Sequence, residues 1–187
     1  MQKDTLHGER LGSVTGSLLI ALRLAAAPLF VAGYLYHRGL WPLVALAVAL
    51  VTDALDGRVG RRWGGRPFLG AWSDALADFV FVVASFAAFV ISGLYPLWAL
   101  FIILAMFAQF LLTSRRDGPV HDPTGKYYGV FLFACIGVTL IWPHELVCRG
   151  VPAALAIVGV ASLVNRVVWL SRAARERSSA QSTIPES

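Results

Sequence analysis

Six long apolar stretches follow one another along this chain of 187 residues, and they constrain its fold more than any other feature. They cover residues 14–36, 40–59, 68–92, 94–113, 125–142 and 151–171. Each is close to the roughly 20 residues that a helix needs to cross the hydrocarbon core of a bilayer. Only 14% of the residues are charged, whereas a soluble domain carries roughly a quarter. The sequence therefore predicts an all-α polytopic membrane protein with six transmembrane helices.

Lysine and arginine are divided unevenly between the two sides of this predicted bundle. With the N-terminus inside, 12 of the 16 fall on the inner side and two on the outer side, while Arg23 and Arg166 lie within spans. Cytoplasmic loops of membrane proteins carry such an excess of positive charge. We therefore expect both termini in the cytoplasm, which requires an even number of spans. This topology also accounts for the net charge of +5 without nucleic-acid binding.

The apolar stretches define one domain with a polar segment at each end. We expect an N-terminal cytoplasmic or juxtamembrane segment over residues 1–13 and a six-helix membrane domain over residues 14–171. Residues 172–187 are a polar C-terminal tail. We expect this tail to be disordered, because it has too few apolar residues to bury.

Four aspartates gather where the second apolar stretch ends and the third begins. Asp53 and Asp56 are three residues apart, and Asp74 and Asp78 are four apart. On helices each pair projects from one face, and two antiparallel helices can bring all four carboxylates to one level. Crowded carboxylates in a partly dry site repel one another, and divalent cations remove that repulsion. Hard oxygen ligands favour Mg²⁺, Mn²⁺ or Ca²⁺, and four can hold two ions suited to phosphoryl transfer.

Two other interpretations of the acidic cluster are open. The aspartates can pair with neighbouring arginines at the helix ends, or they can form the ion site of a divalent-cation transporter. Ionisable groups within membrane spans are costly and usually functional, which disfavours a purely structural role for all four. A transporter needs acids along a whole pathway, and the outer half of the predicted spans contains none.

Small residues and an arginine lie between the aspartates. Gly57, Gly60 and Gly70 lack side chains, so a flat ligand can approach the helix backbone there. Close packing between helices uses small residues in the same way. Arg61 is a candidate for binding a phosphate, because a guanidinium matches two phosphate oxygens at once.

A resemblance to the CDP-alcohol phosphatidyltransferase family is carried by the run Asp53-x2-Asp56-Gly57-x2-Gly60-Arg61-x8-Gly70-x3-Asp74-x3-Asp78. The family signature is D-x2-D-G-x2-A-R-x8-G-x3-D-x3-D. Seven of the eight fixed positions match with every gap preserved, and the departure is Gly60 in place of alanine. The stretch LRLAAAP (Leu22–Pro28) is similar to the Arg-x4-Pro of the family's first span. The stretch TGKYYG (Thr124–Gly129) resembles a Gly-Lys element before its fifth span.

The resemblance implies a six-helix, usually homodimeric membrane enzyme. Such an enzyme moves a phosphatidyl-type group from a CDP-linked lipid donor such as CDP-diacylglycerol to an alcohol acceptor, and it releases CMP. The resemblance implies two divalent cations, Mg²⁺ or Mn²⁺, and an active site on the cytoplasmic side of a bacterial inner membrane. The implied metal ligands are Asp53, Asp56, Asp74 and Asp78, the last also being the general base. The implied contacts to the CDP donor are Gly57, Gly60, Gly70 and Arg61.

Cationic residues in the second half of the chain suggest a phosphorylated acceptor. Arg115, Arg116 and Lys126 flank the third cytoplasmic loop, and Arg166 lies in the sixth stretch. Arg23, in the first stretch, is a further candidate to point toward the site. These groups can bind a phosphate, although topology alone also accounts for the loop arginines and snorkelling for Arg166. We expect glycerol 3-phosphate as the acceptor, with inositol phosphate, phosphatidylglycerol, serine and choline as alternatives.

Overall fold

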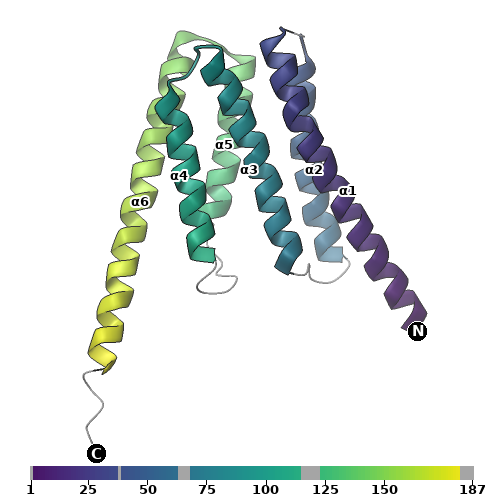
Figure 1. Ribbon diagram of the computed structural model, residues 1–187, viewed down its shortest axis with the longest axis vertical. Coiled ribbons are helices and arrows are strands. Elements are labelled where there is room, and N and C mark those ends of the chain that lie inside the picture. The colour runs from purple at the N-terminus through teal and green to yellow at the C-terminus, as the bar shows by residue number, and fades with distance from the viewer. Residues whose placement is uncertain (1, 38, 63–67, 115–122, 182–187) are drawn as a thin grey trace, which may run out of the picture.

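A computed structural model describes the backbone of residues 2–37, 39–62, 68–114 and 123–181. It describes the side chains of residues 16–37, 39–55, 73, 75–109, 111 and 128–164. Within these ranges the chain forms six helices and no strand, which confirms the predicted all-α fold. The helices are α1 (Gln2–Leu35), α2 (Trp41–Arg62), α3 (Phe68–Ile91), α4 (Leu97–Ser114), α5 (Pro123–Ile141) and α6 (Glu145–Gln181). Successive helices run in opposite directions, and α1 begins at the end of the bundle where α6 ends (Figure 1).

The first and last helices are longer than the apolar stretches within them. α1 includes residues 2–13, which we expected to form a separate segment, and α6 continues to Gln181 through residues that we expected to be disordered. Neither extension contains a proline, and that of α6 is rich in alanine and arginine, which are good helix formers. Helical hydrogen bonds therefore propagate from the apolar part. Residues 182–187 lie outside the described part, and the domain boundaries stay a prediction.

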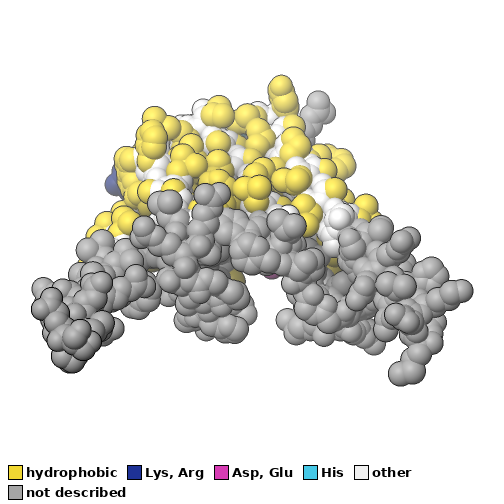
Figure 2. All heavy atoms as spheres, turned by 60° about the horizontal axis from the view of Figure 1, so that its bottom comes forward, with side chains coloured by type: hydrophobic (Ala, Val, Ile, Leu, Met, Phe, Trp, Pro, Cys, Tyr) yellow, Lys and Arg dark blue, Asp and Glu magenta, His cyan; other side chains and the backbone are white. Residues whose placement is uncertain are grey.

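The outer surface of the bundle is strongly apolar. α1 and α6 contain the apolar stretches Gly16–Leu35 and Glu145–Val164, each of 20 residues and long enough to cross a membrane. The other four helices carry apolar stretches of 10–17 residues within the described side chains. Phe101, Leu146 and Ile157 are 62%, 79% and 70% exposed, and yellow apolar atoms dominate the described surface in Figure 2. Water is a poor solvent for so large an apolar surface, whereas lipid is a suitable one.

Helix α3 lies at the centre of the core, and aromatic rings tie its neighbours to it. Phe30 of α1 meets Phe81 and Phe89 of α3 edge-on, with ring centroids 5.6 and 5.9 Å apart. Phe133 of α5 stacks on Phe81 at 5.6 Å. All three phenylalanines Phe30, Phe81 and Phe89 are fully buried. Because such pairs add to the effect of apolar burial, they fix α1 and α5 against α3.

The turn between α3 and α4 is anchored to α5 by a buried hydrogen-bond chain. The Thr139 hydroxyl donates to the carbonyl oxygen of Cys135 at 2.6 Å, so the Tyr95 hydroxyl donates to Thr139. Gly93 adopts a φ of +78° in this turn, a conformation that suits glycine. The end of the bundle away from the two termini is thus closed by specific contacts.

A close approach of α1 to the start of α2 depends on Gly33. A Cβ atom at Gly33 would lie 2.9 Å from Cβ of Trp41 and 3.2 Å from Cδ of Pro42. Neither atom can move far without its backbone. At Gly16, on the same helix, an added Cβ would meet nothing within 4 Å.

We predict that Gly33→Ala lowers the free energy of unfolding by about 1–3 kcal/mol, because the methyl group forces the two helices apart. Gly16→Ala is the matched control, and we expect it to be neutral or to stabilise by up to about 1 kcal/mol through helix propensity. Thermal unfolding of both variants in detergent provides the measurement. Equal stability of the two variants would contradict the close approach.

Candidate active site

The described side chains include four that are polar or charged and buried: Arg23, Thr52, Ser85 and Thr139. The three hydroxyl groups are satisfied within their own helices; Ser85, for example, donates to the carbonyl oxygen of Phe81 at 2.8 Å. Arg23 differs because it carries a full charge and is 0% exposed. A buried charge is very costly unless an opposite charge lies beside it. The charge of Arg23 therefore requires acidic side chains next to it.

The Arg23 guanidinium pairs with two of the four aspartates of the sequence signature. Its Nη1 lies 2.8 Å from Oδ1 of Asp78 on α3. Its Nη2 lies 3.6 Å from Oδ1 of Asp53 on α2. The first contact is a close ion pair, and the second is a looser one. One side chain of α1 thus joins helices α2 and α3, and the packing of α1 against both supports the arrangement.

The two aspartates lie at the same depth in the bundle. Asp53 precedes the last residue of α2 by nine positions, and Asp78 follows the first residue of α3 by ten. At 1.5 Å per residue these offsets are about 14 and 15 Å from the end where α2 and α3 are connected. That end is also the end at which α1 begins and α6 ends (Figure 1). The prediction that antiparallel helices bring these carboxylates together is confirmed for Asp53 and Asp78.

Exposure increases outward from the guanidinium. Arg23 is sealed, the Asp78 side chain is 32% exposed, and the Asp53 side chain is 61% exposed. The carboxylates are therefore accessible from outside the bundle while their counter-charge is not. This order suits a site that receives a charged ligand at its open side.

Asp56 and Asp74 complete the predicted ligand set by their places on the helices. Asp56 follows Asp53 by three positions on α2, and Asp74 precedes Asp78 by four on α3. These spacings put each pair on one helix face, one turn nearer the α2–α3 connection. The side chains of Asp56 and Asp74 lie outside the described part. Among the side chains that are described, no group of three or more metal-binding residues forms.

The donor chemistry of Asp53 and Asp78 fits a hard divalent cation. Both supply carboxylate oxygens, which Mg²⁺ and Mn²⁺ prefer, and both are reachable from outside. The described histidines and cysteines lie elsewhere: Cys135 is in the middle of α5, and His37, His144 and Cys148 lie near helix ends away from the termini. The geometry of any bound metal depends on Asp56 and Asp74 as well.

The sequence pattern of the CDP-alcohol phosphatidyltransferases matches residues 14–171, which is most of the chain. The chain belongs to this family. The match spans all six helices and includes Arg23 and the four aspartates. Family membership favours a transferase over the divalent-cation transporter considered from the acidic cluster.

Two relatives show the range of the family around this chain. A cardiolipin synthase (CMP-forming) of Streptomyces coelicolor is 30% identical over 128 residues, covering 63% of this chain and 59% of that protein. A CDP-diacylglycerol–glycerol-3-phosphate 3-phosphatidyltransferase of Cereibacter sphaeroides is 31% identical over 106 residues, covering 54% and 48%. The chain thus spans only about half to three fifths of the length of these relatives. No solved structure matches it.

The remaining residues of the family signature are placed by backbone alone. Gly57, Gly60 and Arg61 occupy the last two turns of α2, and Gly70 lies in the first turn of α3. Both segments border the α2–α3 connection. Their side chains lie outside the described part, so their contacts with a donor stay a prediction.

The predicted acceptor-binding residues are not brought together by the described part of the chain. Lys126 lies in the first turn of α5 and Arg166 in the second half of α6, but their side chains are not among those described. Arg115 and Arg116 lie outside the described backbone as well. The binding of a phosphorylated acceptor by these four residues stays a prediction.

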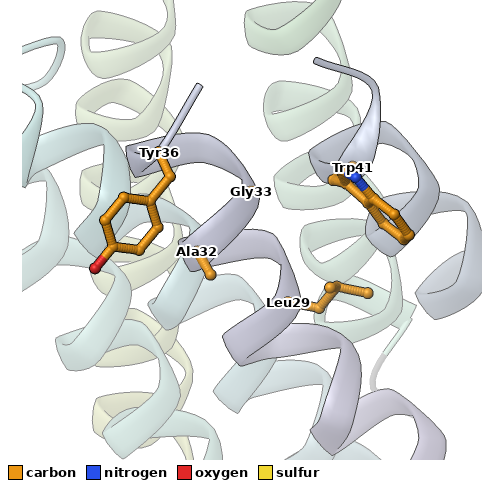
Figure 3. A pocket seen from close by; sticks show the side chains of 5 residues that line it. All are labelled: Leu29, Ala32, Gly33, Tyr36 and Trp41. Carbon is orange, nitrogen blue, oxygen red and sulfur yellow. The ribbon is translucent and has the colours of Figure 1, made fainter. Parts of the chain in front are cut away.

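An apolar pocket of about 340 Å³ lies elsewhere in the molecule, between the second half of α1 and the start of α2. Figure 3 shows Leu29 of α1, Tyr36 in the turn that follows α1, and Trp41 of α2 around it. Trp41 precedes Asp53 by twelve positions on α2, which is about 18 Å along the helix axis. The pocket is therefore separate from the aspartate site.

The pairing of Arg23 with Asp53 and Asp78 is the feature that sequence reasoning missed. Sequence identified Arg23 as a charge within an apolar stretch that is a candidate to point toward the site, but it gave the residue no partner. A signal was present, because an arginine in the middle of a span needs a counter-charge at the same depth. Four aspartates were available, and among the described side chains the packing of α1 brings Arg23 to Asp53 and Asp78.

Proposed function

We propose that this chain transfers a phosphatidyl group from a CDP-linked lipid, CDP-diacylglycerol, to an alcohol acceptor and releases CMP. The observation that carries the proposal is the convergence of Asp53 and Asp78 on one buried arginine in a member of this family. A phosphatidyl transfer needs carboxylates at a place that both a lipid and a water-soluble headgroup can reach. The partly exposed aspartates at mid-depth of an apolar bundle meet that need.

The proposed reaction is a displacement at the phosphorus that carries the diacylglycerol. The acceptor hydroxyl gives its proton to a carboxylate oxygen of Asp78 as its oxygen forms the new bond to phosphorus. The bond between this phosphorus and the oxygen of CMP breaks, and CMP leaves with the electron pair. Asp78 suits the role of general base because its side chain is accessible and lies beside the second carboxylate of the site.

Asp53, Asp56, Asp74 and Asp78 are the proposed ligands of two divalent cations, Mg²⁺ or Mn²⁺. When bound, such cations neutralise the diphosphate of the donor and stabilise the departing phosphate oxygen. The described carboxylates of Asp53 and Asp78 fit this role in donor type and accessibility.

Substrate recognition is proposed on the two sides of the aspartates. Gly57, Gly60 and Gly70 allow the cytidine to approach the helix backbone, and Arg61 binds the diphosphate. The acceptor phosphate is proposed to bind the cationic residues of the second half, which are Arg115, Arg116, Lys126 and Arg166.

We propose that all six helices cross a bacterial inner membrane, with both termini and the active site on the cytoplasmic side. The apolar outer surface and the location of both chain ends at one end of the bundle support this topology. The positive charges of the sequence favour the cytoplasm for that end. A homodimer is proposed from the family resemblance.

The identity of the acceptor is the most specific part of the proposal. The two relatives favour two candidates. Glycerol 3-phosphate is our first choice, since the cationic residues suit a phosphorylated acceptor and one relative is named for it. Phosphatidylglycerol is the second, because the other relative is a cardiolipin synthase.

We predict that CMP release by the purified chain with CDP-diacylglycerol and Mg²⁺ is fastest with glycerol 3-phosphate. A panel of acceptors in mixed micelles provides the measurement, with phosphatidylglycerol, inositol phosphate, serine and choline as the comparison. Faster release with phosphatidylglycerol would assign cardiolipin synthesis instead. Release that persists after stringent removal of divalent cations with EDTA would contradict the metal site.

We predict that Asp78→Asn lowers the rate of CMP release about 100-fold or more, because the amide cannot accept the acceptor proton. The assay uses saturating CDP-diacylglycerol and the best acceptor of the panel. Because this substitution also removes a partner of Arg23, it can destabilise the fold. The midpoint of thermal unfolding therefore shows whether the variant is folded under the assay conditions.

Glu145→Gln is the matched control, because it removes one acidic charge at an exposed position on α6 that pairs with Arg149 at the surface. This variant should retain the full rate. A folded Asp78→Asn variant with the same rate as this control would remove Asp78 from the role of base.

A further inference from the structure

Arg23 has no role in the transfer reaction as described so far, yet it is the most completely buried charge among the described side chains. It lies on α1, whereas the proposed metal ligands and the base lie on α2 and α3. Its side chain is sealed from solvent at 0% exposure, so a substrate cannot reach it directly. Any effect of Arg23 on the reaction must therefore pass through the groups that it contacts.

Among the described side chains, those contacts include two carboxylates of the site itself. The two terminal nitrogens of the guanidinium divide between them, with Nη1 at 2.8 Å from Asp78 and Nη2 at 3.6 Å from Asp53. A planar fork with two donor nitrogens holds two acceptors at a fixed separation, which a single ammonium group cannot do. Each carboxylate is held through its Oδ1 atom.

The carboxylates need such a constraint. Asp53 is 61% exposed and can turn toward solvent, and its charge repels that of Asp78. The apolar packing of α1 holds the guanidinium in place, since Ala26, Ala27 and Phe30 of the same helix are buried in the core. Arg23 thus holds two partly exposed carboxylates in place relative to the packed core.

On the basis of the proposed function, we propose that Arg23 is a positioning residue that fixes Asp53 and Asp78 in the arrangement needed to bind divalent cations and to accept the proton. Groups that orient metal ligands from behind typically change metal affinity or activity by about 10–100-fold when they are lost. Loss of the positive charge alone acts in the opposite direction, because it makes the site more negative and more attractive to cations. The sign of the change in metal affinity therefore separates orientation from charge.

The test compares Arg23→Lys and Arg23→Met with the unchanged chain, each purified at full length in detergent. Arg23→Lys keeps the charge but loses the fork. We expect it to remain folded, to bind Mn²⁺ about 10-fold more weakly or worse, and to lose kcat while the KM for CDP-diacylglycerol changes little. The Mn²⁺ affinity is measured by electron paramagnetic resonance of unbound Mn²⁺, which requires no catalytic turnover.

Arg23→Met loses both the charge and the planar guanidinium. Weaker Mn²⁺ binding by its folded fraction would support the role of Arg23 in orienting the two carboxylates. Unchanged or tighter Mn²⁺ binding would overturn that role. If this variant does not fold, Arg23→Lys decides alone: a folded lysine variant with normal Mn²⁺ affinity and normal kcat overturns the inference. Arg149→Lys is the matched control, because Arg149 is 81% exposed in its surface pair with Glu145.

The failure of this inference and that of the proposed function are distinguishable. Absence of CMP release by the unchanged chain with every acceptor would refute the proposed function. Normal release by the unchanged chain together with normal Mn²⁺ binding by Arg23→Lys would refute only the role of Arg23.

Discussion

A single buried guanidinium is the constraint around which the described site is organised. Arg23 is fully enclosed in an apolar bundle, and its charge is tolerated because Asp78 and Asp53 lie against it. This requirement determines how α1 packs against α2 and α3, since the three side chains must meet at one depth. The carboxylates that pair with the arginine are also the groups to which we assign the proposed phosphatidyl transfer.

The rest of the core supports this meeting point. Rings of Phe30 and Phe81 lock α1 to α3 on the side of Arg23 away from the termini, and the close approach at Gly33 holds α1 against the start of α2. The apolar outer surface suits lipid. The contacts of α1 with α2 and α3 thus stabilise the fold and also hold the residues of the proposed active site.

The sequence predicted the fold well because apolar stretches and turn residues report directly on helices in an apolar environment. It did not predict that α6 continues to Gln181, because the polar composition of residues 172–187 is typical of disorder, although alanine and arginine there favour a helix. The spacing of Asp53 and Asp78 predicted that they lie at one level, because the two residues are at similar distances from the connection between two antiparallel helices. The contact of Arg23 with Asp53 and Asp78 was not predicted, because residue spacing along a helix does not give the rotation of α1 relative to α2 and α3.

The claim that Arg23 and Asp78 are held together as a buried pair is tested most directly by a double-mutant cycle on stability. The free energy of unfolding is measured for Arg23→Met, for Asp78→Asn and for the two combined. We expect the double variant to lose less stability than the two single losses together, by about 1–3 kcal/mol, because neither member of the Arg23–Asp78 pair is then left without the other. Losses that add to within about 0.5 kcal/mol would show that the two side chains do not interact and would contradict the account.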